Sequence, residues 1–289
     1  MKVVLLEPYG YCVGVERAIK IALDTKSVNQ NKRVIILGML VHNEDAINEL
    51  TSQGIETLYQ KDKSLMDLVD EIPSDSIVIL TAHGHSEDLE KKLISRKIEF
   101  IDATCPFVKA TFKRILEAAN DNHDILYIGK KNHPESNAAL SISKKVHLVD
   151  IENPSFEVED SKPLIINQTT FSQREVNDVT NAIKTKYKDA EVFPSVCKAS
   201  TDRQNAILSL DNKIELFYVV GGTNSNNTKT LAKLAKESHP HAKVILIKNR
   251  NDINKKDLLG LSYVAIASGA STPKHISEEV KTYIESLYN

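Results

Sequence analysis

Short apolar runs alternate along the chain with segments in which apolar residues recur at helical spacing. The runs are three to five residues long and rich in Val and Ile, which is typical of strands covered on both faces of a parallel sheet. The expected strands are Val3–Leu6, Val34–Leu37, Ile77–Leu80, Ile98–Ile101, Ile125–Ile128, Leu164–Ile166, Leu216–Val220, Val244–Ile247 and Tyr263–Ala267. The expected helices between them include Arg17–Leu23, Val108–Ala119 and Lys229–Lys236. This alternation predicts an α/β protein with largely parallel sheets.

Three cysteines mark a longer repeat in this pattern. Cys12 and Cys105 are 93 residues apart, and Cys105 and Cys197 are 92 apart. Each cysteine follows a strand pattern and precedes a helical one, and Pro106 stands at the first helical position, where proline is favoured. We therefore expect three similar α/β domains around a pseudo-threefold axis, with their strand-to-helix turns pointing inward. The expected domain bounds are 1–103, 104–194 and 195–289.

The composition narrows the classes of partner. The 37 basic and 39 acidic residues give a net charge of -2, which does not favour nucleic acid or an anionic membrane as the main partner. The N-terminal apolar run ends at Glu7 and Pro8, which is too early for a signal segment or a membrane-spanning helix. We expect a cytoplasmic monomer, in which an odd number of cysteines act as thiols or thiolates.

The place of each cysteine before a helix favours metal binding. The N–H groups and the dipole at a helix N-terminus stabilise a thiolate, which is the form that binds a metal. A single cysteine is more often a small buried apolar residue, but three in one local context favour a shared metal centre. The chain has no C-x-x-C pair, so zinc-ribbon and ferredoxin patterns are absent. Three thiolates could hold zinc together with a histidine, or a four-iron cluster with one open iron, and spacing alone does not distinguish the two.

Polar residues follow several other expected strands. His42, His83 and His133 each come shortly after a strand pattern, with glycines nearby that allow close approach of the backbone. A single histidine at such a place is more often a loop or capping residue, but three of them predict an anion-binding pocket. Gly221–Asn227 precedes a helix and is typical of a phosphate-binding nest, although it matches no Walker A or dinucleotide-binding sequence. The other strand ends with hydroxyl or amide side chains, each also explicable as a turn or cap, are Asn167–Thr170 and Ala267–Ser271.

Glu135 is the best-placed candidate for a proton donor. It lies two residues after His133, in a turn that a glycine precedes. Burial beside a metal centre raises the pKa of a carboxyl group, so that the group can donate a proton near neutrality. The sequence thus predicts an acid next to the anion-binding pocket.

Taken together, these segments resemble the 4-hydroxy-3-methylbut-2-enyl diphosphate reductases of the IspH or LytB family. The resemblance extends from near the N-terminus to near the C-terminus, in order and with compatible spacing. The matching stretches are Gly10–Ala18, Val41–Asn43, Ala82–Gly84, Asp102–Pro106, His133–Glu135, Gln168–Thr170, Cys197 with Arg203 and Gln204, Asn224–Asn227, and Gly269–Ser271.

The resemblance implies an iron–sulfur oxidoreductase of the methylerythritol phosphate route to isoprenoids. It implies three similar α/β domains in a pseudo-threefold trefoil around a central [4Fe–4S] cluster. Cys12, Cys105 and Cys197 hold this cluster, whose open iron takes the substrate hydroxyl. Two electrons and two protons then remove that hydroxyl as water, and the products are isopentenyl and dimethylallyl diphosphate. The implied electron donor is a ferredoxin or flavodoxin. The residues implied to bind or act on the substrate are Glu135, Thr169, His42, His83, His133, Ser225, Asn227 and Ser271.

Two positions depart from the family pattern. Lys198 follows the third cysteine, where the family often has an aromatic or apolar residue. Asn226 stands where the family often has a second serine. An asparagine can still donate a hydrogen bond to phosphate, so we keep Asn226 among the expected substrate-binding residues.

Two other classes of function use the same residues. A zinc-dependent lyase or hydrolase of a phosphorylated metabolite would bind one zinc through the cysteines and a histidine. An iron–sulfur sensor without enzymatic activity would keep the cluster and bind a partner protein. Metal content and diphosphate binding distinguish these alternatives from the reductase.

Overall fold

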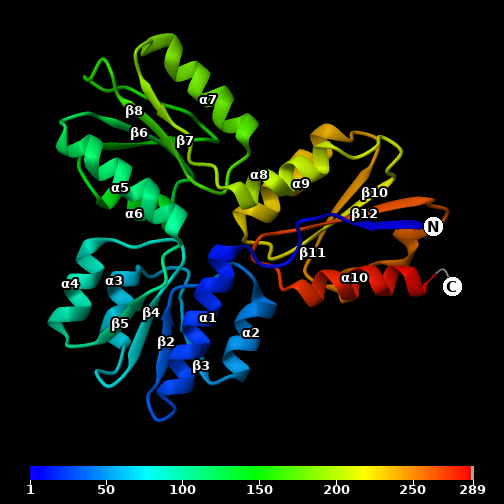
Figure 1. Ribbon diagram of the computed structural model, residues 1–289, viewed down its shortest axis with the longest axis horizontal. Coiled ribbons are helices and arrows are strands. Elements are labelled where there is room, and N and C mark those ends of the chain that lie inside the picture. Colours follow the sequence, from blue (N-terminus) through cyan, green and yellow to red (C-terminus); the bar gives the residue numbers. More distant parts are fainter. Residues whose placement is uncertain (288–289) are drawn as a thin grey trace. The chain divides into compact units, whose positions relative to one another are not determined.

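The computed structural model describes residues 1–287 and contains three four-stranded parallel sheets (Figure 1). Sheet A has the strand order β1 (Lys2–Leu5), β12 (Tyr263–Ser268), β10 (Leu216–Val220) and β11 (Lys243–Ile247). Sheet B has the order β3 (Ile55–Leu58), β2 (Val34–Leu37), β4 (Ile77–Leu80) and β5 (Glu99–Asp102). Sheet C has the order β7 (Val146–Asp150), β6 (Ile125–Gly129), β8 (Leu164–Asn167) and β9 (Glu191–Phe193). Every strand pair is parallel, which confirms the predicted α/β class.

Helices connect the strands, as parallel pairing requires. The α-helices are α1 (Val13–Val28), α2 (Glu44–Ser52), α3 (Leu65–Leu68), α4 (Glu87–Ser95), α5 (Pro106–Asn120), α6 (Pro134–Ser141), α7 (Gln173–Lys186), α8 (Lys198–Leu208), α9 (Asn226–Ser238) and α10 (Lys274–Ser286). Short 3-10 helices span Val69–Glu71, Arg250–Asp252 and Lys255–Leu258. No helix in residues 1–287 is both long and apolar enough to span a membrane.

The three sheets share one topology, so the predicted repeat of similar α/β parts is confirmed. In sheets B and C the first two strands of the repeat form one side, and the next two complete the other side. Sheet A follows the same plan with β10, β11 and β12, but its fourth strand is β1 from the start of the chain. The repeat is therefore closed by the N-terminal strand β1, drawn in blue, which lies beside the orange β12 in Figure 1.

The pairing of β1 differs from the expected domain bounds. Those bounds placed residues 1–103 in a single domain, whereas Lys2–Leu5 is hydrogen-bonded to Tyr263–Ile266. The apolar pattern of Val3–Leu6 is compatible with pairing to any parallel strand. Its partner is 261 residues away in sequence, so the local pattern carries no information on which sheet it joins.

The chain forms two compact units. The first unit comprises residues 1–15 and 41–48 together with the chain from Cys197 onward. The second comprises residues 16–40 and 49–196. Sheet A thus belongs to the first unit, and sheets B and C belong to the second.

Each sheet is covered by helices on both faces, which explains the continuously apolar strands. In sheet A, Phe217 and Val219 of β10 pack against α8 and α9, while Tyr218 and Val220 pack toward α10. In sheet C, Tyr127 faces α5 and α6, and its neighbours in β6 face α7. Sheet B is covered by α1 and α2 on one face and by α3 and α4 on the other.

Each cysteine stands where the chain passes from one sheet to the helix that covers the next. Cys105 follows β5 of sheet B and precedes α5, which packs on sheet C. Cys197 follows β9 of sheet C and precedes α8, which packs on sheet A. Cys12 follows β1 of sheet A and precedes α1, which packs on sheet B. The prediction that each cysteine precedes a helix is confirmed. In each case this helix packs on a different sheet from the one that contains the strand before the cysteine.

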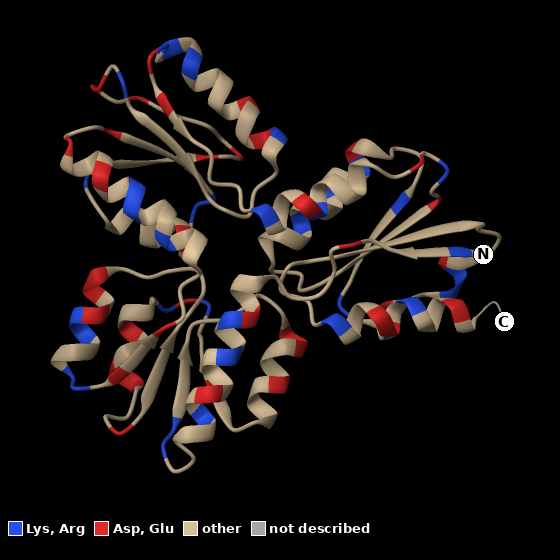
Figure 2. Ribbon diagram, viewed as in Figure 1, with Lys and Arg blue, Asp and Glu red and all other residues tan. Residues whose placement is uncertain are grey.

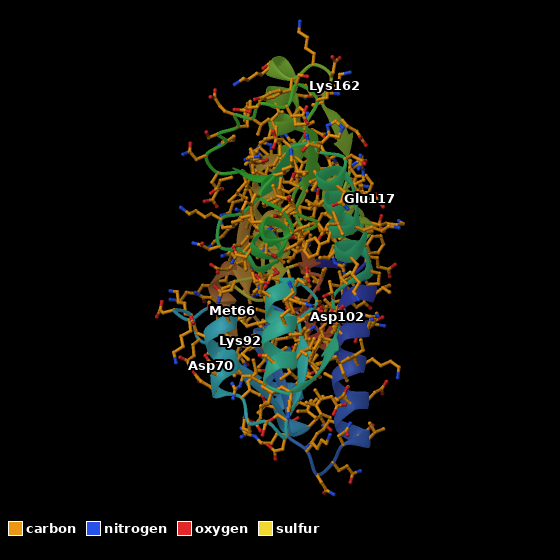
Figure 3. All side chains as sticks on the ribbon, turned by 90° about the vertical axis from the view of Figure 1, so that its left-hand side faces the viewer. Met66, Asp70, Lys92, Asp102, Glu117 and Lys162 are labelled. Carbon is orange, nitrogen blue, oxygen red and sulfur yellow. The ribbon has the colours of Figure 1, made fainter. Side chains whose placement is uncertain are left out.

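The charged residues lie mainly on helices and loops, and both signs are intermixed along α1, α4 and α10 (Figure 2). One such contact joins neighbouring helices of sheet B. Lys92 of α4 donates to the Met66 carbonyl oxygen at 2.7 Å and to the Asp70 carboxylate at 2.8 Å (Figure 3). The charge of Lys92 is therefore paired with a neighbouring carboxylate, in agreement with the nearly equal numbers of basic and acidic residues in the chain.

Candidate functional site

The carboxyl ends of the central strands carry a recurring arrangement of a glycine and a polar residue. The first strand of each repeat ends at a glycine or directly before one, and a polar residue follows four positions later. His133 and Ser225 are the N-caps of α6 and α9, and each side chain accepts a hydrogen bond from the first turn of its helix. The three glycine and polar pairs are Gly38 with His42, Gly129 with His133, and Gly221 with Ser225.

Glu135 is buried in the second unit, at the first turn of α6. Its side chain is enclosed between the ends of β6 and β8, and only 1% of the residue is exposed. The backbone N–H of Thr169 donates to Oε1 at 2.8 Å, and the Thr169 hydroxyl donates to Oε2 at 3.0 Å. The Tyr127 hydroxyl also donates to Oε1, at 3.4 Å. The structure thus places Thr169 and Glu135, two of the residues implied to act on the substrate, in direct contact.

Burial sets the protonation of this carboxyl group. Removal from water raises the pKa of Glu135 to about 7, although the hydrogen bonds from Thr169 and Tyr127 act in the opposite direction. The same burial, together with the carboxylate, raises the pKa of Tyr127 well above its ordinary value, so the phenol stays protonated. A buried carboxyl with a pKa near neutrality can take up and release a proton under ordinary conditions.

Two predicted histidines lie beside this acid in the second unit. His133 caps α6 by accepting a hydrogen bond from the backbone N–H of Glu135 at 3.2 Å. The ring of His83 stands edge-on to that of His133, with 5.7 Å between the ring centroids. The backbone N–H of Cys105, the cysteine of this unit, donates to the carbonyl oxygen of Ala82, so Cys105 adjoins the His83 segment. The structure thus brings His83, which follows β4 of sheet B, next to His133 and Glu135, which follow β6 of sheet C.

In the first unit, Asn227 is the centre of a second polar network. Its Oδ1 accepts from the backbone N–H of Ala270 at 2.9 Å, and its Nδ2 donates to the Ser200 hydroxyl at 3.2 Å. The Ser200 oxygen is 3.2 Å from the sulfur of Cys197. The carbonyl oxygen of Ala270 accepts from the backbone N–H of Cys12 at 3.0 Å. One continuous set of hydrogen bonds therefore links both cysteines of this unit to Asn227.

Arg203 lies between the two cysteine segments of this unit. It is 4% exposed, and its guanidinium group donates to the carbonyl oxygens of Gly10 at 2.7 Å and Ser268 at 3.2 Å. Burial lowers the pKa of Arg203, while the thiols of Cys12 and Cys197 act to raise it. Arg203 thus places a buried guanidinium group beside Cys12 and Cys197, the two predicted metal ligands of this unit.

The remaining predicted ligands of the first unit also lie at the carboxyl edge of sheet A. Ser225 is 4% exposed and accepts from the backbone N–H of Thr228. The hydroxyl of Ser271 is buried and has no hydrogen-bond partner within the described chain, which suits a site for a polar ligand. Asn226, the first residue of α9, is half-buried.

His42 packs against the loop that follows β10. A Cβ atom at Gly222 would lie 2.0 Å from the His42 carbonyl oxygen, so this close approach requires glycine. Burial and the charge of Lys229 both lower the pKa of His42. The imidazole is therefore neutral near pH 7 and offers one donor and one acceptor nitrogen.

The three cysteines divide between the units, Cys12 and Cys197 in the first and Cys105 in the second. All three are half-buried, and in the described chain none takes part in a disulfide. Thiolates at helix N-termini are a donor set that suits an iron–sulfur cluster. Among residues 1–287, no three His, Cys, Asp or Glu side chains form a group that could hold a metal ion, so the three-cysteine ligand set stays a prediction.

Three residues of these networks were not singled out from the sequence as site residues. Tyr127 interrupts the aliphatic strand Ile125–Gly129, and this polar-tipped residue in a buried strand was the available signal. Ser200 stands three residues after Cys197, and a hydroxyl at that helical position can reach back to the capping residue. Arg203 belongs to the matching stretch after Cys197, but no local feature indicates that its side chain is buried between two cysteines.

Comparisons with known proteins extend over the whole chain. The family described as LytB protein matches residues 3–285. A 4-hydroxy-3-methylbut-2-enyl diphosphate reductase of Bacillus pumilus is 37% identical over 99% of this chain and 91% of its own. The reductase of that name from Malacoplasma penetrans is 34% identical over 99% of this chain and 97% of its own.

Solved structures agree with these relatives. The E-1-hydroxy-2-methyl-but-2-enyl-4-diphosphate reductase of Plasmodium falciparum is 26% identical, with a TM-score of 0.88 over 99% of this chain and 88% of that chain. A second structure, of an (E)-4-hydroxy-3-methyl-but-2-enyl diphosphate reductase described as the terminal enzyme of the non-mevalonate pathway, is 27% identical. Its TM-score is 0.67 over 98% of this chain and 99% of that chain. The chain therefore belongs to the LytB protein family, together with these reductases.

Proposed function

We propose that this chain reduces (E)-4-hydroxy-3-methylbut-2-enyl diphosphate to isopentenyl and dimethylallyl diphosphate. The observation that carries the proposal is the buried Glu135–Thr169 pair in a chain that belongs to the LytB family along nearly its whole length. The relatives that share the chain's full length bear the name of this reductase. An acid with a pKa near 7 at the carboxyl end of a central strand is what a dehydroxylation requires.

Cys12, Cys105 and Cys197 would hold the [4Fe–4S] cluster. Their support is chemical and topological, because each one precedes a helix at a crossover between sheets. When bound, the cluster supplies two electrons and, at the iron without a protein ligand, a Lewis acid. A one-electron carrier of the ferredoxin or flavodoxin type would supply those electrons.

The proton chemistry belongs to Glu135 and Thr169. Protonated Glu135 can donate to the Thr169 oxygen at 3.0 Å, and the Thr169 hydroxyl can then donate onward to the leaving hydroxyl of the substrate. The departing oxygen leaves as water with one added proton, and the second proton goes to the allyl carbon skeleton. Glu135 regains its proton readily because its pKa lies near that of the surrounding solution.

The diphosphate would bind to donors other than lysine or arginine side chains. His42, His83, Ser225, Asn227 and Ser271, with His133 and Asn226, offer imidazole, amide and hydroxyl groups at the carboxyl ends of strands. The N-terminus of α9 adds its N–H groups and positive dipole end. Preorganised donors of these kinds bind a diphosphate without requiring a cluster of lysines.

The test uses anaerobically purified and reconstituted full-length protein. We expect a brown protein with about four irons per chain, which consumes the hydroxylated diphosphate when an artificial one-electron donor is supplied. The two isomeric diphosphates should appear in an amount equal to the substrate lost. A colourless protein with a single tightly bound zinc would contradict the proposal, and so would an iron-loaded protein that leaves the substrate unchanged.

A further inference from the structure

The three cysteines differ in the residue that stands three positions further along the helix. Val15 follows Cys12 at this distance and Val108 follows Cys105, whereas Ser200 follows Cys197. A residue at this position faces the capping residue across the first turn of the helix. Cys197 is thus the one cysteine of the three whose helix places a hydroxyl within reach of its sulfur.

The structure places that hydroxyl against the sulfur. Cys197 is the N-cap of α8, and its sulfur lies 3.2 Å from the Ser200 oxygen. Ser200 is 1% exposed, so water does not compete for this contact. Cys197 and Ser200 also share the backbone hydrogen bond from Ser200 N–H to the Cys197 carbonyl oxygen at 2.9 Å, which holds the two residues in register.

The direction of the hydrogen bond follows from the neighbours. The Ala270 N–H donates to Asn227 Oδ1, so the amide of Asn227 must present its NH₂ group to Ser200. The Ser200 oxygen therefore accepts from Asn227, and its single hydrogen is available for another acceptor. The sulfur of Cys197 lies within reach, and a thiolate can only accept.

We propose that Ser200 is a positioning residue that donates a hydrogen bond to the Cys197 thiolate and so raises the reduction potential of the metal centre. The inference rests on the proposed function, since it requires the cluster at Cys197. A hydrogen bond to a ligand sulfur stabilises the more negatively charged, reduced state of an iron–sulfur cluster. Asn227 sets the orientation of Ser200 and also belongs to the expected diphosphate site, so one side chain joins substrate binding to the metal ligand.

The experiment compares the reduction potentials of reconstituted full-length proteins by a redox titration followed by electron paramagnetic resonance. We expect Ser200→Ala to keep the iron content of the wild type and to shift the potential to a more negative value. Ser200→Thr keeps the hydroxyl and should restore the potential toward that of the wild type.

A matched control is available one residue further along α8. Thr201 donates its hydroxyl to the Cys197 carbonyl oxygen at 3.3 Å and not to the sulfur. Thr201→Ala therefore removes a hydroxyl from the same turn and should leave the potential unchanged. An equal shift in Thr201→Ala and Ser200→Ala would overturn the inference, because the effect would then come from the helix and not from the sulfur contact.

The remaining outcomes separate this inference from the proposed function. If the wild type and Ser200→Ala carry equal iron and titrate at the same potential, the inference is wrong and the proposed function stands. A wild type that loads no iron overturns both. If Ser200→Ala does not load iron, Asn227→Asp takes its place, because a carboxylate would accept the Ser200 hydrogen and draw it away from the sulfur. An unchanged potential in iron-loaded Asn227→Asp would then overturn the inference.

Discussion

The first turns of α6 and α9 make the same hydrogen bond with different chemical groups. Glu135 and Asn227 each stand two residues after the N-cap of their helix, at the carboxyl end of a central strand. Glu135 accepts from the Thr169 N–H at 2.8 Å, and Asn227 accepts from the Ala270 N–H at 2.9 Å. Thr169 and Ala270 are themselves equivalent, since each lies two residues beyond the end of the neighbouring strand.

This comparison separates a structural role from a chemical one. The backbone hydrogen bond fastens the helix to the adjacent strand end, and either a carboxyl or an amide oxygen can accept it. The second polar atom differs, because Glu135 directs Oε2 to the Thr169 hydroxyl while Asn227 directs NH₂ to Ser200. The carboxyl group of Glu135 can therefore take up and release a proton, whereas the amide of Asn227 can only orient Ser200 and donate a hydrogen bond to it.

In the remaining repeat, that of sheet B, the corresponding residue is Glu44, two residues after His42, and it neither carries a buried proton nor orients a second side chain. Glu44 begins α2 on the surface, where its carboxylate forms an ion pair with Lys248 at 2.7 Å. Water screens the charges of such an exposed ion pair, so the pair contributes little to stability. The same backbone plan thus supports an acid, an amide or a surface ion pair, and burial decides between them.

Replacing the acid by an amide is expected to have the largest effect. In Glu135→Gln, the side-chain carbonyl can still accept from the Thr169 N–H, as Asn227 does from Ala270. The fold and the iron content should therefore be retained, while turnover falls by about 10²–10⁴-fold because a positioned proton donor is lost. Steady-state reduction of the diphosphate substrate, with iron determined on the same sample, measures both. Unchanged turnover would show that another group delivers the proton.

The free energy of unfolding should depend on pH differently in the wild type and in Glu135→Gln. The pKa of Glu135 is raised from 4.5 to about 7 in the folded state, so the folded protein binds this proton more tightly than the unfolded chain. Its contribution to the free energy of unfolding is complete below about pH 4.5 and is lost as the pH rises through 7. The loss corresponds to roughly 3 kcal/mol in the limit of an ordinary unfolded pKa.

The measurement is urea unfolding of wild type and Glu135→Gln at several pH values between 4.5 and 8. The difference in unfolding free energy should change in favour of Glu135→Gln as the pH rises. Thr169→Ser, which keeps the hydroxyl and the backbone N–H, is the matched control and should follow the wild type. A difference that does not change with pH would contradict the raised pKa.

Converting the amide to an acid tests the other side of the comparison. In Asn227→Asp, one oxygen can still accept from Ala270, but the donor to Ser200 is lost and a negative charge enters the expected diphosphate site. Loss of a hydrogen bond to a charged group costs about 1.5–3 kcal/mol, which corresponds to a rise in KM of about 10–100-fold. Substrate titration of the iron-loaded variant measures this change. A KM equal to that of the wild type would place the diphosphate elsewhere.

Replacing the exposed residue Glu44 should change activity and stability least. Glu44→Gln breaks an ion pair whose two side chains are 60% and 41% exposed. Such pairs contribute less than about 1 kcal/mol to stability. Turnover and iron content should equal those of the wild type, and thermal unfolding should change by only a few degrees. A loss of activity here would mean that the surface of α2 takes part in the reaction.

Whether a strand could be predicted from the sequence depended on how much of the strand is buried. All nine expected strands are present, because strands covered on both faces are continuously apolar. The three strands outside that set, β3, β7 and β9, lie at sheet edges and contain polar residues, as in Ile55–Leu58. An edge strand has one solvent-facing side, so its local pattern resembles that of a loop or a turn.

The candidate site was predicted unevenly for a related reason. Residues in distinctive local contexts, such as Cys105 before Pro106 or Ser225 before a helix, were found because capping and helix initiation are local. Arg203 was not, because its role depends on the carbonyl oxygens of Gly10 and Ser268, which are far away in the sequence. A buried arginine and an exposed one have the same local sequence signal.

By itself, the sequence determined the α/β class, the threefold recurrence of strand, cysteine and helix, and the residue types at the strand ends. These features follow from hydrophobic periodicity and helix capping, which act over a few residues. Only the tertiary structure decided that β1 completes sheet A, that Glu135 meets Thr169, and that Ser200 lies between Asn227 and Cys197. Strand pairing and burial depend on partners distant in the chain, and burial turns an ordinary glutamate into an acid with a pKa of about 7.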